Sequence, residues 1–268
     1  MDATVTISAN VDLSNMPGNH TAFNEVWSIA AASTTPPGLH DQPVDTSTPP
    51  TFEEPIDVSW PAVPRLRRSL VVDIDEFWFL IEQSARETTS KETRLKWLHE
   101  RLAQRPAEEI VDFGAWMLTA RRQIDTWLMW SAVRALYLDG SDDGFWYFQM
   151  WLVGLGRETF ERVVRDPDTL VDVPAVRRLV VMTQKRQSWT NDDWPTFESL
   201  DYVAMSAWEQ ATGKGHEKLS EALRSRGFEL FALPNPTDEA WELDNAEESA
   251  RRLPRTHRYM RELYSRRT

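Results

Sequence analysis

The chain has 268 residues, 41% of them apolar and 27% charged, with a net charge of -12, which is an ordinary composition for a globular protein with one large domain. The absence of cysteine excludes disulfides, thiolate metal sites and cysteine catalysis. No apolar run is long enough to span a membrane and no secretory signal opens the chain, which favours a cytoplasmic protein without a membrane partner.

The N-terminal part of the chain is acidic and rich in proline. Residues 1–64 contain nine of the 16 prolines and eight acids but no lysine or arginine. The proline pairs at 36–37 and 49–50 disfavour both helix and central strand. We therefore expect an arm over residues 1–70, largely disordered or docked on a helical domain that occupies residues 71–268.

Helical periodicity begins after the arm. We expect Asp73 to cap a first helix, Thr89 to start a second in a T-x-x-E pattern, and Pro106 to open a third. The apolar stripe of this third helix continues as far as residue 138, and a helix of that length is expected to kink at Gly114 or within residues 121–123.

The second half of the chain also reads as helical. Ser141 is a good N-cap for a helix that runs to about Val153, and Asp166-Pro167-Asp168 predicts a turn. The segment 176–185 is β-branched enough to suit a strand, although we expect a helix there. Further helices are expected at 157–164, 196–211, 217–226 and 245–253, followed by a basic helix after Pro254. The whole pattern predicts an all-α fold, a single irregular helical bundle.

Several spaced motifs occur in order between Ile74 and Arg255. They are Trp127-x-x-Trp130, Ser141-Asp142-Asp143-Gly144-Phe145, Tyr147-Phe148-x-x-Trp151-Leu152, Gly156-Arg157-Glu158 and Asp166-Pro167-Asp168-x-Leu170. In this combination they resemble a bacterial domain-of-unknown-function family, DUF4240. The resemblance implies a largely helical domain and no settled activity. Leu128 stands where the family usually has an acid, and Asp139-Gly140 where it usually has Gly-Cys. Chemistry that relied on that acid or thiol would be lost in this chain.

The stretch from Trp127 to Glu158 is where we expect a ligand. It concentrates four tryptophans, and its Ser-Asp-Asp motif puts two acids beside the free N–H groups of a helix start. Farther along the chain, Glu198 and Tyr202 stand at i and i+4 and are expected on one helix face beside this stretch. The candidate ligand-binding residues are Trp127, Trp130, Asp142, Asp143, Trp151, Arg157, Glu158, Glu198 and Tyr202.

A simpler interpretation of the same residues stays open. The tryptophans are then core side chains, and the two aspartates only cap their own helix. Arg157 would close a salt bridge with Asp142 or Asp143 instead of orienting a ligand carboxylate through its guanidinium fork. Glu198 would be a solvated acid beside a half-buried Tyr202.

Neither a cofactor nor a metal is predicted. The five histidines show no i, i+4 pair, and Gly213-Lys214-Gly215 lacks the flanking residues of a phosphate loop. Seven arginines cluster in the last eighteen residues, but the chain has no other broad basic region, which argues against nucleic acid as a partner.

These features favour a binding or regulatory module that recognises a peptide or protein segment in an aromatic and acidic pocket, with its own N-terminal arm among the candidates. One alternative is an enzyme acting on a peptide or small polar substrate, in which Asp142, Asp143, Glu198 and Arg157 supply acid–base and orienting groups and the arm is a tethered substrate or lid. A second alternative is an immunity-type inhibitor whose acidity matches a basic toxin.

Overall fold

The computed structural model describes residues 72–136, 138, 141–231, 233–236, 238–243 and 245–265. Within these ranges the chain forms α-helices and short 3-10 helices and no strand, which confirms the predicted all-α fold. The predictions for the arm over residues 1–70 lie outside the described residues. No helix in the described ranges combines the length and the apolar character needed to cross a bilayer.

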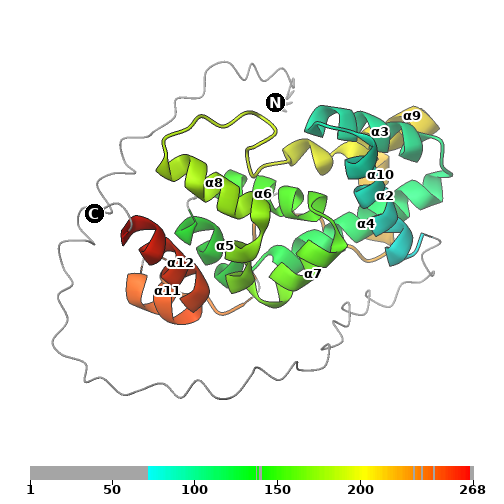
Figure 1. Ribbon diagram of the computed structural model, residues 1–268. Coiled ribbons are helices and arrows are strands. Elements are labelled where there is room, and N and C mark those ends of the chain that lie inside the picture. The colour runs from blue at the N-terminus through cyan, green and yellow to red at the C-terminus, as the bar shows by residue number, and fades with distance from the viewer. Residues whose placement is uncertain are drawn as a thin grey trace, which may run out of the picture. The chain divides into compact units, whose positions relative to one another are not determined.

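The helices are connected mostly by short turns (Figure 1). Helices α9 and α10 pack against α4, and α3 packs against α9, while α11 and α12 pack beside α5 and the 3-10 helix η2. Their bounds are α2 (Ile74–Glu87), α3 (Lys91–Ala103), α4 (Ala107–Ile124), α5 (Trp127–Ala135), α6 (Asp142–Gly154), α7 (Arg157–Arg165), η2 (Pro167–Asp172), α8 (Pro174–Gln184), η3 (Glu198–Leu200), α9 (Val203–Thr212), α10 (His216–Ser225), α11 (Ala246–Arg252) and α12 (Pro254–Ser265).

Capping residues set the starts of the first helices. Asp73 caps α2 as predicted, because its side chain accepts a hydrogen bond from the backbone N–H of Glu76 at 2.8 Å. The predicted start of α3 at Thr89 was wrong by one residue. Ser90 is the N-cap, and it forms a reciprocal capping box with Thr93, which leaves Glu92 outside the box.

The predicted long third helix is two helices. The break falls at Asp125 and Thr126, just after the polar residues 121–123, and not at Gly114. The Thr126 hydroxyl accepts from the backbone N–H of Met129 at 3.1 Å and so caps α5. The buried carboxylate of Asp125 accepts from the Gln149 side-chain amide at 3.2 Å and from the backbone N–H of Asn235 at 2.8 Å. These bonds make a new helix start more favourable than continuation of α4.

Helix α6 is the most completely buried α-helix that the structure describes. Ser141 caps it as predicted, through a 3.0 Å bond from the backbone N–H of Gly144. It contacts α2, α4, α7 and η3, and side chains on all its faces are buried. Gly156 ends the turn into α7 with a φ of 94°, a left-handed conformation that glycine adopts without steric cost.

Two further segments show where the helices predicted near residues 176 and 196 form. Residues 174–184 form the helix α8 despite their β-branched side chains. The helix predicted from Thr196 begins only at Val203, because the preceding residues run along α6 and the backbone N–H of Phe197 donates to the carbonyl of Tyr147 at 3.0 Å. Glu198 and Tyr202 therefore belong to a 3-10 turn and a helix cap, not to one α-helix.

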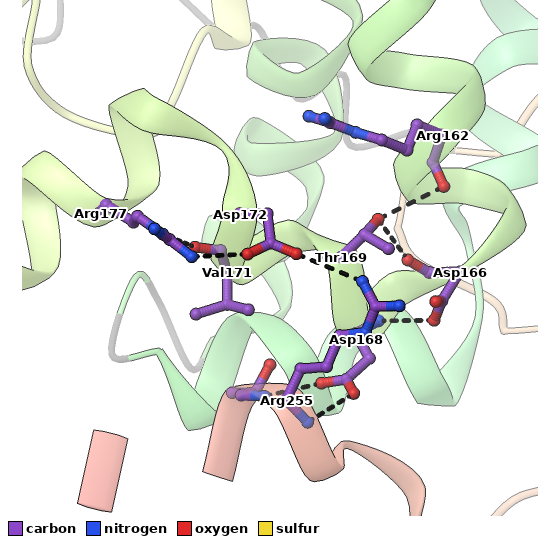
Figure 2. A network of polar contacts seen from close by, with 9 residues as sticks. Arg162, Asp166, Asp168, Thr169, Val171, Asp172, Arg177 and Arg255 are labelled. Carbon is purple, nitrogen blue, oxygen red and sulfur yellow. Dashed lines mark hydrogen bonds and ion pairs between the residues drawn. The ribbon is translucent and has the colours of Figure 1, made fainter. Parts of the chain in front are cut away.

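A buried aspartate connects η2 to the C-terminal helices (Figure 2). Asp168 is 5% exposed, and its two carboxylate oxygens accept from the backbone N–H groups of Arg255 and Thr256 at 2.7 and 2.8 Å. These are first-turn donors of α12 that no residue of α12 itself can satisfy. Asp172 lies nearer the surface and pairs with Arg177 and Arg255.

Replacing Asp168 with alanine is expected to lower the free energy of unfolding by about 2 kcal/mol, because buried N–H groups of α12 lose a charged acceptor. Urea unfolding followed by circular dichroism measures the change. Asp172→Ala is the matched control, since it removes partly exposed ion pairs and should cost less than about 1 kcal/mol. Equal losses in the two variants would contradict the capping role of Asp168.

Candidate functional site

The predicted tryptophans belong to a column of aromatic rings that joins α5 to α6. Trp127 stacks on Trp130 at 5.6 Å, and Trp130 stacks on Phe145 at 4.9 Å. The column continues through Phe148 to Trp151, whose ring centroids are 5.7 Å apart. Trp130 and Trp151 are buried, so most of this column is core, and Trp151 also lines a recess.

The predicted acids and arginine near α6 and α7 do not form one site. Asp142 and Asp143 are exposed in the first turn of α6. Arg157 pairs with Asp75 of α2 and with Glu161 at 2.6 Å, so the predicted salt bridge from Arg157 to Asp142 or Asp143 was wrong. Glu158 is exposed at the start of α7.

Three of the predicted residues gather around Tyr147. The Tyr202 hydroxyl donates to Glu198 Oε1 at 3.5 Å, and the carboxylates of Glu198 and Asp143 both raise the pKa of Tyr147, after the larger effect of burial. Burial, followed by Glu198, raises the pKa of Tyr202 to about 12. Both phenols therefore remain protonated donors at neutral pH.

A buried arginine that the sequence analysis did not select lies behind this group. Arg121 is 2% exposed and donates to Gln149 Oε1 at 3.1 Å and to the carbonyl of Phe231 at 2.9 Å. Its guanidinium lies over the rings of Trp146 and Phe231, at 4.8 and 4.4 Å from their centroids. Arg121 thus holds the segment around residue 231 against α4 and α6.

Two carboxylates balance this buried charge. Asp201 lies 3.5 Å from the guanidinium of Arg121, and Asp125 lies 3.7 Å from that of Arg122. Burial lowers the pKa of Arg121 and raises the pKa values of Asp125 and Asp201. Because these groups satisfy one another inside the domain, the Arg121 network is positioned to stabilise the fold and not to contact a ligand.

The recess lies where five segments meet: the end of α2, the start of α3, the end of α6, the start of α8 and the loop before η3. Its volume is about 290 Å³. The rings of Trp151 and Phe197 and the side chain of Leu179 supply apolar wall, and charged groups stand among them. The charged residues that line it are Lys91, Arg94, Arg178, Asp192 and Asp193.

Arg94 is the most deeply placed of these cations. Its guanidinium donates to Ser84 Oγ and to the Ile81 carbonyl, both at 3.3 Å, and to the Gly154 carbonyl at 2.9 Å. It also lies over the Phe197 ring, 5.4 Å from the centroid. Burial lowers the pKa of Arg94 to about 10. Among the described residues, no carboxylate forms an ion pair with it.

Lys91 stands at the first position of α3, beside the loop at 190–194. Its Nζ donates to the carbonyls of Asn191 and Trp194 at 2.7 and 2.6 Å, and its backbone N–H donates to the Asp192 carboxylate at 2.9 Å. Burial lowers the pKa of Lys91 to about 8, against the opposing effects of Asp192 and Asp193. The Asp193 carboxylate is itself paired with Arg178 at 2.6 Å.

This arrangement favours binding an anionic group next to an apolar one. The cationic side chains and the positive end of the α3 dipole attract negative charge, and the rings exclude water. In the described ranges, no group of three or more histidines and acids is arranged to hold a metal ion. Of the predicted residues, only Trp151 lines the recess.

The sequence did contain a signal for Arg94. It lies four residues before Leu98 and eight before Leu102, and both leucines are completely buried. A charged residue in line with a buried helix stripe indicates either an internal ion pair or a binding group. Lys91 had no such signal, because its surroundings come from a loop about a hundred residues later in the chain.

The fold and the recess define an all-helical domain with a cationic and aromatic recess between α2, α3, α6 and α8. A family model described as "Protein of unknown function (DUF4240)" matches residues 72–210, slightly more than half of the chain, and the chain belongs to this family. The match includes every residue that lines the recess, and it ends well before Arg255, where we expected the resemblance to end. No curated protein and no solved structure matches the chain.

The side chain of Lys91 is expected to titrate near pH 8, well below the value of about 10.4 for a free lysine side chain. The folded chain loses this proton at a lower pH than the unfolded chain does. The destabilisation caused by burying the charged Lys91 side chain therefore declines, and stability rises, as the pH increases from about 8 to about 10.4. The 13Cε shift of Lys91, assigned with Lys91→Gln, measures the titration.

Two variants test the causes of this shift in opposite directions. Asp192→Asn should lower the pKa of Lys91 further, because a carboxylate that favours the ammonium form is lost. Arg94→Gln should raise it, because a like charge is lost. A midpoint that stays at the free-lysine value in the unmodified chain would contradict the burial of this amine.

Proposed function

We propose that this protein is a binding module that recognises a peptide or protein segment and seats one or two side chains of that segment in the recess. The recess itself is the observation that carries the proposal, since a cavity of about 290 Å³ combines aromatic wall with cationic side chains. Pockets for whole small molecules typically measure about 300 to 1,000 Å³. A recess just below that range suits a side chain that a longer chain presents.

An exposed tryptophan next in the chain to the recess-lining residues Asp192 and Asp193 supports recognition of a partner. Trp194 is 45% exposed, and its ring meets that of Trp189 edge to face at 4.7 Å. The backbone carbonyl of Trp194 accepts from Lys91 Nζ, so the indole belongs to the segment that borders the recess. Large exposed aromatic residues next to a pocket are typical anchors of protein interfaces.

The placement of the other predicted residues supports binding over catalysis. Asp143, Glu198 and Tyr202 gather around Tyr147 near the surface, whereas Arg157 is paired with acids of α2 and α7. Acid–base catalysis needs such groups within hydrogen-bond reach of one reacting atom. The proposed orienting arginine and the proposed acids have separate partners, which favours the binding interpretation.

A phage-displayed library of random twelve-residue peptides, selected on the immobilised full chain, tests this function. We expect enrichment of related peptides, and fluorescence anisotropy then measures their affinity. Ala85→Phe should weaken their binding by about tenfold or more, which is roughly 1.4 kcal/mol, because an exposed rim residue of the recess becomes a ring that occupies it.

Ala211→Phe is the matched control, since it makes the same change at an exposed position of α9 away from the recess lining. It should leave peptide affinity within twofold of the unmodified chain. The proposal fails when no peptide is enriched, or when the enriched peptides bind the Ala85→Phe variant as tightly as the unmodified chain.

A further inference from the structure

We infer that the recess binds an oxyanion, the carboxylate or phosphate of a ligand, between the side chains of Arg94 and Lys91. The inference deepens the proposed function by naming the chemical group that the recess selects. It rests on the proposed function only for the rest of the ligand, which that function takes to be a peptide or protein segment. The oxyanion site itself consists of residues that line the recess whatever the ligand is.

Three cations and two acids line the recess, which leaves one excess positive charge. Asp193 is engaged by Arg178, and Asp192 accepts the backbone N–H of Lys91 and is exposed. The Nζ of Lys91 and the guanidinium of Arg94 instead contact carbonyl and hydroxyl oxygens. Two partly buried cations thus face one cavity with neutral acceptors as their direct partners among the described residues.

Both cations keep donors for a ligand. An ammonium has three N–H donors, and two of those of Lys91 are used by the carbonyls of Asn191 and Trp194. A guanidinium has five, and Arg94 uses its Nε and Nη2 on Ser84, Ile81 and Gly154. The Nη1 of Arg94 donates to no acceptor among the described residues.

Gly154 lets the Phe197 ring pack closely against α6 beside Arg94. A Cβ at this position would lie 3.6 Å from Nη1 of Arg94 and 3.2 Å from Cδ1 of Phe197. The second distance is shorter than an ordinary carbon–carbon contact, so a side chain here would push Phe197 away from its place in the recess wall. The glycine therefore preserves the aromatic wall beside Arg94.

An oxyanion would accept hydrogen bonds from the unused N–H donors of Arg94 and Lys91. A partly desolvated cation without a counter-ion is unfavourable, and a carboxylate or phosphate oxygen forms short charge-assisted bonds with arginine and lysine. Burial lowers the pKa values of both cations, and nearby carboxylates, Asp192 and Asp193, oppose this effect at Lys91. Thr89 and Ser90, which also line the recess, add the positive end of α3 on the same side.

The experiment titrates the full-length chain with sodium acetate or with inorganic phosphate, against sodium chloride at equal ionic strength. The readout is the side-chain 15Nε resonance of Arg94, assigned with Arg94→Gln, together with tryptophan emission. We expect saturable shifts with at least one of the two oxyanions and none with chloride. Stronger binding of acetate identifies a carboxylate ligand, and stronger binding of phosphate identifies a phosphate monoester.

Two pairs of variants on the same helix provide the comparison. Arg94→Gln and Lys91→Gln should each weaken oxyanion binding about tenfold. Arg101→Gln and Lys96→Gln make the same changes in α3 outside the recess and should stay within twofold of the unmodified chain. Thermal melting establishes that each variant is folded, and the Arg94 resonance of the unmodified chain tests the inference without any substitution.

Acetate affinity is expected to fall as the pH rises from 7 to 9.5, because Lys91 loses its charge in this range. Acetate itself does not titrate there, and Asp192, Asp193, Arg94 and Arg178 are the other charged groups around the amine. Lys91→Gln should remove most of the fall.

The outcomes separate this inference from the proposed function. Oxyanion binding at Arg94 without any selected peptide supports the inference and overturns the peptide proposal. Selected peptides that bind while neither oxyanion moves the Arg94 resonance overturn the inference alone, as do shifts that chloride reproduces. Oxyanion binding that is equal in Arg94→Gln and in the unmodified chain also overturns it.

Discussion

The burial of α6 on nearly every side is the constraint on which the other elements depend. A helix with Phe145, Phe148, Met150, Leu152 and Val153 all buried must be surrounded by apolar faces of its neighbours. Helices α2, α4 and α7 and the turn η3 supply those faces. The recess exists because this enclosure is incomplete near Gly154, where polar residues of α2 and α3 replace apolar packing.

Two arginines show how differently the domain treats a guanidinium. Arg121 is enclosed between two aromatic rings and has Asp201 within 3.5 Å, so its charge is balanced inside the fold. Arg94 has a ring on one side and bonds to carbonyls and a serine hydroxyl, with no ion pair in the described part of the chain. The first arrangement is complete as it stands, and the second leaves room for a charge from outside.

The sequence predicted the fold class and most helices, because caps such as Asp73 and Ser141 and the apolar periodicity are local signals. The sequence did not predict helix boundaries that contacts with distant segments determine. The break at Asp125 depends on Gln149 and on Asn235, and the late start of α9 depends on a bond from Phe197 to α6. The candidate site followed the same rule. Trp151 was found from its neighbours in sequence, whereas Lys91 and Arg94 became visible only through loops and helices brought to them by the fold.

The bond from Asp168 to α12 has a consequence for where the cooperative unit ends. Asp168 belongs to the part of the chain that the family model covers, but both backbone donors that it binds lie more than forty residues past residue 210. A chain cut at that boundary would lack these donors and the packing of α12 against η2. Fragments designed for binding or crystallographic work should therefore extend through α12, although the family signature stops earlier.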